Sequence, residues 1–262
     1  MPGNLDRLAD QRCPRYDPAM ARFRYFVDTT APRYSLLFAL PLLLGYEALA
    51  WLLGGGGHSG IRNGADVLLK SLFVLLGGRH GLTVFTLMVV GAGGWLVLRD
   101  VHRNGTPRLR AFGLMLAESA GYGLLLGGVA SALTGLLLEG RLLSIQGGAM
   151  AQFDLPTQLM VSLGAGIYEE LLFRVLLVSG LVALASKGFG WKPVPAGVFA
   201  AVSGALVFSV FHYVGPYGDP WQLGSFTFRA VAGLLFSGLY LVRGFGVAAW
   251  SHALYDVFLT LV

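Results

Sequence analysis

Long apolar stretches, separated by glycine, proline and charged residues, follow one another along most of the chain. Apolar residues dominate eight stretches, at residues 35–53, 65–77, 82–98, 111–138, 158–185, 194–213, 226–242 and 246–262. Most of them approach or exceed the roughly 20 residues that an α-helix needs to cross a bilayer. Polar and apolar residues do not alternate persistently, so a β-barrel is not expected. The pattern predicts an all-α fold, a polytopic bundle of membrane helices.

The composition also indicates a membrane protein. Of the 262 residues, 55% are hydrophobic and only 13% are charged, whereas a soluble globular domain has about 25% charged residues. The net charge of +5 does not indicate nucleic-acid binding, because the basic residues stand mainly at the edges of the apolar stretches. We therefore expect the lipid bilayer, and no nucleic acid, among the partners.

The lysine and arginine positions predict the topology. The stretch at 65–77 is short and carries Lys70 in its middle, so we expect this helix to lie at the membrane interface. The other seven helices then span the membrane, and most basic residues fall on the cytoplasmic side. We predict an integral protein of a bacterial cytoplasmic membrane with its N-terminus in the cytoplasm. The stretch at 35–53 is expected to be a retained membrane helix rather than a cleaved signal peptide.

The chain divides into three regions of one integral membrane domain. Residues 1–33 form a polar, arginine-rich N-terminal arm. Residues 34–153 contain the first membrane helices, and residues 154–262 contain a C-terminal membrane core that holds most of the ionisable residues found within apolar stretches. We expect the chemistry of the protein to lie in this core.

Ionisable residues at bilayer depth need an explanation, because each costs about 2.5–3.5 kcal/mol even on the lowest scale. The densest group is Glu169, Glu170 and Arg174 in one apolar stretch. Glu170 and Arg174 are four residues apart and can pair on one helix face. Glu169 points away from this pair, so Arg174 does not neutralise its carboxylate, which suits a general base. The alternative is that both glutamates only tie helices together.

Two further groups follow on later helices. Phe208 and His212 share a face near the end of one stretch, and His252 and Asp256 share a face of the last. Each group alone has a structural explanation, an interfacial histidine or a helix-stabilising His–Asp hydrogen bond. At 1.5 Å per residue, Glu169, His252 and Asp256 lie at compatible depths, whereas His212 lies nearer the membrane surface.

In this order, the three groups resemble the CPBP family of intramembrane proteases, the CAAX proteases and bacteriocin-processing enzymes, also called the Abi family. The Ras-converting type of CAAX endopeptidase belongs to it. The family pattern is EExxxR, then FxxxH, then HxxxN or HxxxD, on successive membrane helices. The chain reads EELLFR at 169–174, FSVFH at 208–212 and HALYD at 252–256. The resemblance runs from about residue 155 to the C-terminus.

The resemblance implies a role for each matching position. It implies that Glu169 activates a water molecule with the help of His212, and that His252 and the residue at 256 face the developing oxyanion. It also implies supporting roles for three residues: Glu170, Arg174 and Phe208.

The family has either asparagine or aspartate at this position, and this chain has Asp256. Asparagine can donate a hydrogen bond to an oxyanion, which an ionised aspartate cannot. Asp256 is therefore expected either to be protonated or to orient His252.

Zinc is the alternative to a metal-free site. Two histidines and a carboxylate with an open coordination position suit a catalytic zinc ion. The ligands would be the four candidate catalytic residues: Glu169, His212, His252 and Asp256. The resemblance to the Ras-converting type implies a glutamate-activated water without metal, so we expect no cofactor.

These observations predict an intramembrane endopeptidase with a peptide or protein substrate in the membrane, one that is membrane-anchored, prenylated or leader-bearing. Serine, HExxH zinc and aspartyl intramembrane proteases fit less well, since their motifs are absent or incomplete. The alternative is a non-enzymatic membrane protein, either a proton-coupled transporter or an immunity or partner-binding protein. The unexplained Glu47 and Glu118 favour that alternative, while the lack of repeated halves counts against a transporter.

Overall fold

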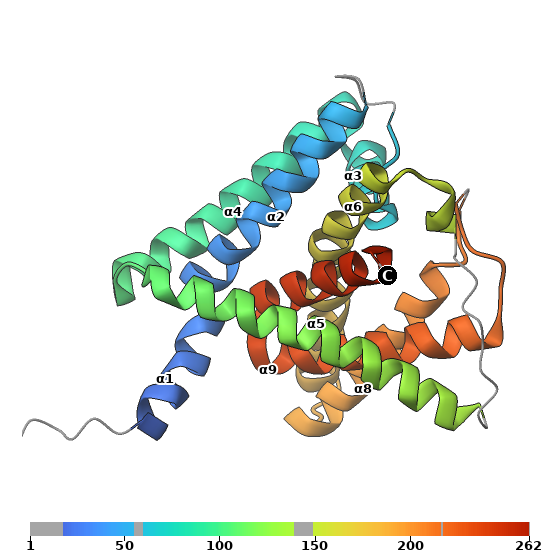
Figure 1. Ribbon diagram of the computed structural model, residues 1–262. Coiled ribbons are helices and arrows are strands. Elements are labelled where there is room, and N and C mark those ends of the chain that lie inside the picture. Colours follow the sequence, from blue (N-terminus) through green and yellow to red (C-terminus); the bar gives the residue numbers. More distant parts are fainter. Residues whose placement is uncertain (1–17, 55–59, 139–148, 216, 262) are drawn as a thin grey trace, which may run out of the picture.

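Helices make up the regular structure of the described part of the chain (Figure 1). The computed structural model describes residues 18–54, 60–138, 149–215 and 217–261. The principal helices are α1 (Pro18–Thr30), α2 (Pro32–Leu53), α3 (Gly64–Gly77), α4 (Gly81–Asn104), α5 (Leu109–Leu137), α6 (Leu155–Gly164), α7 (Ser179–Ala183), α8 (Pro193–Phe211) and α9 (Leu223–Leu261). Shorter or π-helical segments are η1 (Gly78–His80), η2 (Ala149–Gln152), η3 (Ala165–Val178) and η4 (Leu184–Gly188). The all-α prediction is confirmed.

Six stretches of the described residues are long and apolar enough to cross a membrane. They are Pro32–Leu53, Gly64–Asn104, Leu109–Leu137, Leu155–Gly188, Pro193–Phe211 and Leu223–Leu261. Two of them contain a break: η1 separates α3 from α4, and Gly244, at φ 76°, divides α9 into two arms, 223–243 and 245–261. A positive φ is a conformation that favours glycine. These breaks explain why eight apolar stretches were predicted.

The length of α3 agrees with a helix that does not cross the membrane by itself. Its 14 residues extend about 21 Å at 1.5 Å per residue, which is shorter than the roughly 30 Å hydrocarbon core of a bilayer. The arrangement of seven spanning helices and one interfacial helix stays a prediction, as does the cytoplasmic N-terminus.

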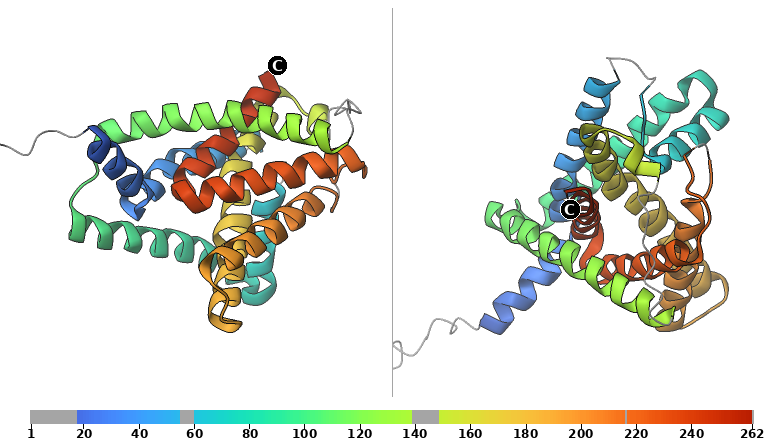
Figure 2. Two further views of the ribbon diagram at one scale, coloured as in Figure 1. Left: turned by 90° about the horizontal axis from the view of Figure 1, so that it is seen from below. Right: turned by 45° about the vertical axis from the view of Figure 1, so that its right-hand side comes forward.

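The second arm of α9 runs through the middle of the bundle (Figure 1). Helix α5 packs along α9, while α2, α6, α8 and η3 contact it from other sides (Figures 1 and 2). Small buried residues, Ala248, Ala249 and Ala253 among them, line this arm. Small side chains let helix backbones approach closely in membrane proteins, and this approach gathers the C-terminal motifs.

Helix α1 is anchored to the bundle by charged and polar contacts. Arg243 is 2% exposed and forms an ion pair of 2.6 Å with Glu118 of α5. Tyr25 of α1 donates a hydrogen bond of 2.8 Å to Glu118, and Arg243 donates one of 2.9 Å to Thr29. The predicted polar arm therefore includes helix α1, which contacts the bundle through Tyr25 and Thr29, while residues 1–17 lie outside the described residues. Glu118, which the sequence left unexplained, has a structural role.

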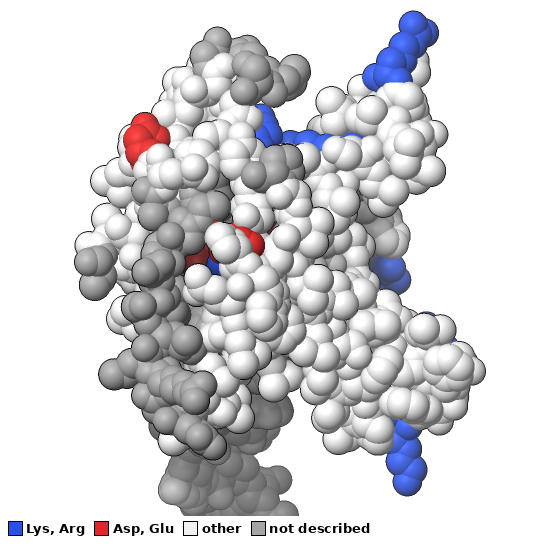
Figure 3. Space-filling model, turned by 90° about the vertical axis from the view of Figure 1, so that its right-hand side faces the viewer, with Lys and Arg blue, Asp and Glu red and all other residues white. Residues whose placement is uncertain are grey.

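The outer surface is largely apolar. Leucine and valine side chains on α3, α4, α5 and α8 are exposed, including Leu75 at 81% and Val194 at 76%. On the face shown in Figure 3, charged side chains appear at only a few isolated places. An exposed apolar surface this extensive fits contact with lipid rather than water.

Candidate active site

Glu169 and Glu170 lie in η3, the π-helical continuation of α6. Both side chains are buried, with exposures of 7% and 0%. Small residues at the start of η3 let it approach the second arm of α9, because a Cβ atom at Gly166 would lie 2.7 Å from Cβ of Ala253. π-Helical turns occur frequently at functional sites. The two glutamates therefore face the centre of the bundle from an unusual stretch of helix.

Glu170 is held between a cation and a histidine. Its Oε1 lies 3.1 Å from the guanidinium of Arg174, so the ion pair predicted from the i,i+4 spacing is present. The same oxygen is 2.7 Å from Nδ1 of His252, a contact that sequence spacing did not predict. Arg174 is 1% exposed and its guanidinium lies 4.5 Å from the ring centre of Phe208. Glu170, Arg174 and Phe208 thus form a support beneath His252.

His252 presents its other nitrogen to two carboxylates. Nε2 lies 3.9 Å from Oε2 of Glu169 and 3.7 Å from Oδ2 of Asp256. Both distances exceed the usual length of a direct hydrogen bond. Phe236 stacks on the imidazole with ring centres 4.7 Å apart. Because Glu170 already holds Nδ1, the His–Asp hydrogen bond considered from the sequence is replaced by a His–Glu hydrogen bond.

His212 joins the group from the end of α8. The helix ends at Phe211, and His212 Nδ1 is 2.9 Å from the carbonyl oxygen of Phe208. A carbonyl can only accept, so Nδ1 donates and Nε2 is left as an acceptor in the neutral ring. The backbone N–H of Asp219 donates to the carbonyl of His212 at 2.9 Å, so the loop between α8 and α9 returns to His212. His212 lies close enough to Glu169 for an electrostatic interaction.

Phe208 connects the two histidines. Its ring centre lies 4.7 Å from that of His212 and 6.0 Å from that of His252. The lesser depth of His212 estimated from the sequence therefore does not separate it from the others. The structure brings together four side chains that the sequence singled out as catalytic candidates: Glu169, His212, His252 and Asp256.

Sequence reasoning missed Asn63. This residue precedes α3 and is 3% exposed, and its Nδ2 donates a hydrogen bond of 2.8 Å to Oε1 of Glu169. Its Oδ1 accepts from the N–H of Ala65, so Asn63 is also the N-cap of α3. An asparagine before an apolar stretch is a recognisable N-cap signal. Nothing in that signal indicates a partner 106 residues away.

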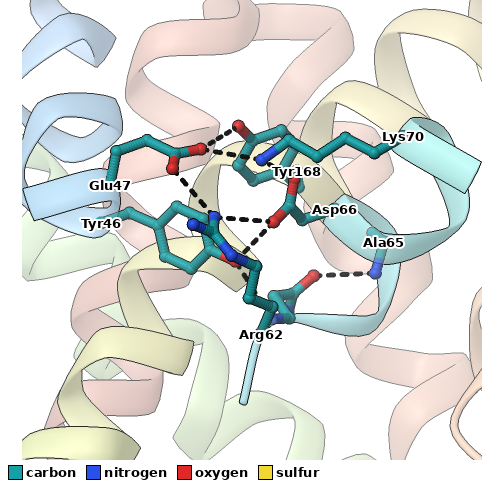
Figure 4. Close-up of polar contacts among 8 residues, drawn as sticks. Tyr46, Glu47, Arg62, Ala65, Asp66, Lys70 and Tyr168 are labelled. Carbon is teal, nitrogen blue, oxygen red and sulfur yellow. Dashed lines mark hydrogen bonds and ion pairs between the residues drawn. The ribbon is translucent and has the colours of Figure 1, made fainter. Parts of the chain in front are cut away.

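A cluster of charged and phenolic side chains (Figure 4) contacts Asn63 through the hydroxyl of Tyr46. This α2–α3 cluster consists of Tyr46, Glu47, Arg62, Asp66, Lys70 and Tyr168. Glu47 accepts hydrogen bonds from Arg62 at 2.8 Å, from Lys70 at 3.0 Å and from Tyr168 at 2.8 Å. Glu47, unexplained by the sequence, therefore ties α2 to α3 and η3.

Asp66 is the buried centre of the α2–α3 cluster. Its side chain is 0% exposed and forms an ion pair of 2.6 Å with Lys70. It also accepts a hydrogen bond of 2.8 Å from the hydroxyl of Tyr46. Buried charges need such pairing and hydrogen bonding, because a buried charge left without its partner is strongly destabilising.

The donors near Glu169 do not converge as metal ligands do. Among the residues that the structure describes, no three His, Cys, Asp or Glu side chains are placed to hold a metal ion together. Glu170 occupies Nδ1 of His252, and the remaining Nε2 has carboxylate oxygens at 3.7 and 3.9 Å. The structure therefore gives no support to the four-residue zinc site considered from the sequence, and a metal-free reaction stays a prediction.

The comparisons agree with the motif pattern. Residues 151–258 match the family model described as "Type II CAAX prenyl endopeptidase Rce1-like". No curated protein and no solved structure matches the chain. The matched residues include all three motifs and exclude Asn63, and they are consistent with the CPBP resemblance. Over residues 151–258, the chain is therefore similar to the Rce1-like family of type II CAAX prenyl endopeptidases.

Proposed function

We propose that the protein is an intramembrane endopeptidase that uses Glu169 to activate a water molecule. The observation that carries this proposal is the different use of two adjacent glutamates. Oε1 of Glu170 is engaged by both Arg174 and His252. Glu169 instead turns Oε2 toward the free nitrogen of His252, 3.9 Å away. A carboxylate and an imidazole nitrogen separated by this distance can both contact one water molecule or one oxyanion.

The reaction follows from these positions. Glu169 takes a proton from water as the hydroxide attacks the carbonyl carbon of the scissile peptide bond. The carbonyl oxygen becomes an oxyanion, which accepts a hydrogen bond from Nε2–H of protonated His252. When the tetrahedral intermediate collapses, the C–N bond breaks and Glu169 returns its proton to the leaving amine. The products are a new carboxyl terminus and a new amino terminus.

His212 and Asp256 complete the proposed site. With Nδ1 donating to the carbonyl of Phe208, His212 presents Nε2 as an acceptor for the second proton of the water. Asp256 lies on the oxyanion side of His252. Glu170 already orients His252, so we assign Asp256 to the oxyanion, to which a protonated carboxyl can donate.

The proposed substrate is a peptide or protein held at the membrane by a prenyl group, an anchor or a leader. The name of the matching family refers to prenyl endopeptidases, and an apolar outer surface gives lipid-anchored chains access from the bilayer. We place the protein in a bacterial cytoplasmic membrane, with the N-terminus in the cytoplasm. The glutamates cited for a transporter, Glu47 and Glu118, both have structural partners, so no observation favours that alternative.

The test is a cleavage assay with the purified protein in lipid nanodiscs. A panel of labelled peptides would include a farnesylated C-terminal peptide, its unprenylated counterpart and a leader-type peptide. We expect fragments from at least one lipid-bearing peptide with wild-type protein and none with Glu169→Gln. Asp154→Asn is the matched control, because the same chemical change at the N-cap of α6 preserves the cap. Equal cleavage by Glu169→Gln and wild type would overturn the proposal.

A further inference from the structure

Asn63 reaches the proposed catalytic base from the part of the chain outside the family match. It comes from the segment before α3, whereas the match covers residues 151–258. Its amide donates to Oε1 of Glu169 at 2.8 Å. The other oxygen, Oε2, is the one that lies near Nε2 of His252. The two oxygens of Glu169 therefore have different surroundings.

Asn63 is fixed from several directions. Its Oδ1 accepts from the N–H of Ala65 at 2.9 Å, and its own N–H donates to the hydroxyl of Tyr46 at 3.2 Å. That hydroxyl donates in turn to buried Asp66. A side chain whose polar atoms are all engaged in this way cannot rotate without breaking buried hydrogen bonds, each costly to lose. The amide is therefore preorganised to receive one carboxylate oxygen.

Gly164 permits this approach. A Cβ atom there would lie 2.6 Å from Cε2 of Tyr46 and 2.8 Å from Cβ of Asn63. Both distances are shorter than non-bonded carbons tolerate. The glycine before η3 thus lets the Asn63 segment and Tyr46 contact the helix that carries Glu169.

We infer that Asn63 is a positioning residue for the reaction: its amide holds Oε1 of Glu169, so that Oε2 faces the water and takes the proton. The inference rests on the proposed function. It assigns a role in the site to the first half of the chain, which the family match does not cover. Holding the carboxylate in one orientation speeds the proton transfer, because the reacting atoms already have the required geometry.

Asn63→Ser tests the inference without removing the helix cap. Serine caps helices about as well as asparagine, but it lacks the amide and is too short to reach Glu169. We expect kcat to fall about 10- to 100-fold with KM changed less than about twofold, as for loss of a hydrogen bond to a charged group. The matched control is Asn104→Ser, which removes an amide–carboxylate hydrogen bond of 2.6 Å to Asp100 at the exposed end of α4. Its activity should equal that of wild type.

A spectroscopic measurement separates this inference from the proposed function, because it needs no substrate. The infrared difference between each protein and its Glu169→Gln counterpart isolates the carboxyl band of Glu169. The band should shift in Asn63→Ser and stay in place in Asn104→Ser. An unshifted band, or a wild-type kcat in Asn63→Ser, would overturn the inference while leaving cleavage by Glu169 intact. Cleavage that survives Glu169→Gln would instead remove the proposed function.

Discussion

Oε1 of Glu170 lies 2.7 Å from Nδ1 of His252, across 82 residues of sequence. The contact joins the first and last motifs of the C-terminal half and leaves Nε2 of His252 directed at Glu169 and Asp256. Carboxylates that hold a functional histidine in this way fix its orientation and tautomer. We therefore propose that Glu170 orients His252, which leaves Glu169 available for chemistry.

Glu170→Gln should lower catalysis without preventing folding. The amide keeps the shape of the side chain but loses the charge that faces Arg174 and His252. Loss of such an outer partner typically costs about 10- to 100-fold in activity. The measurement is kcat on a cleaved peptide, with thermal unfolding in detergent as the control for folding. A wild-type kcat in the folded variant would mean that the Glu170–His252 contact does not contribute to catalysis.

Asp256→Asn should retain activity, whereas Asp256→Ala should lose it. An asparagine amide donates to an oxyanion without needing a proton on a carboxyl group. Removing a single oxyanion donor costs about 10²- to 10³-fold in kcat. The two variants are compared on the same peptide. If the alanine variant cleaved as fast as the asparagine variant, the side chain at 256 would not contact the oxyanion.

Gly166→Ala should destabilise the protein, because the added methyl group would press on Ala253 in the second arm of α9. Overpacking of this kind costs about 1–3 kcal/mol. The matched control is Gly180→Ala in the same helical run, where a Cβ atom meets nothing within 4 Å. Thermal unfolding of both variants checks the prediction. Equal midpoints would show that close packing of η3 on α9 does not hold the site together.

Chelation should leave cleavage unchanged. The proposed reaction uses only side chains, and within the described part of the chain no trio of His, Cys, Asp or Glu is arranged as a metal site. The experiment is dialysis of active protein against 1,10-phenanthroline and EDTA, followed by assay with and without added zinc. Loss of activity that zinc restores would favour the metal-dependent alternative instead.

Much of the helical fold could be predicted from the sequence. Apolar stretches and glycine breaks are local signals, and they predicted the helices that meet at Gly244. The Glu170–Arg174 pair was also predictable, because residues four apart share a helix face. Local spacing likewise suggested that Glu169 is not neutralised by that pair.

The long-range partners could not be predicted in the same way. Glu170 meets His252, and Asn63 meets Glu169, only because η3 approaches α9 and the segment before α3 at small residues. The i,i+4 spacing of His252 and Asp256 suggested a hydrogen bond between them. However, Nε2 of His252 and Oδ2 of Asp256 are 3.7 Å apart, and the histidine forms its hydrogen bond with Glu170 instead. Sequence periodicity predicts which residues share a face of one helix, but it does not predict which faces of different helices contact each other.

The most direct test of the central claim is the single-turnover cleavage rate of Glu169→Gln against wild type on one peptide, with both proteins folded and equally stable. General-base catalysis contributes about 10²- to 10⁴-fold, so the account predicts a rate at least about 100-fold lower in Glu169→Gln. A Glu169→Gln protein that cleaves at the wild-type rate would contradict the assignment of Glu169 as the base.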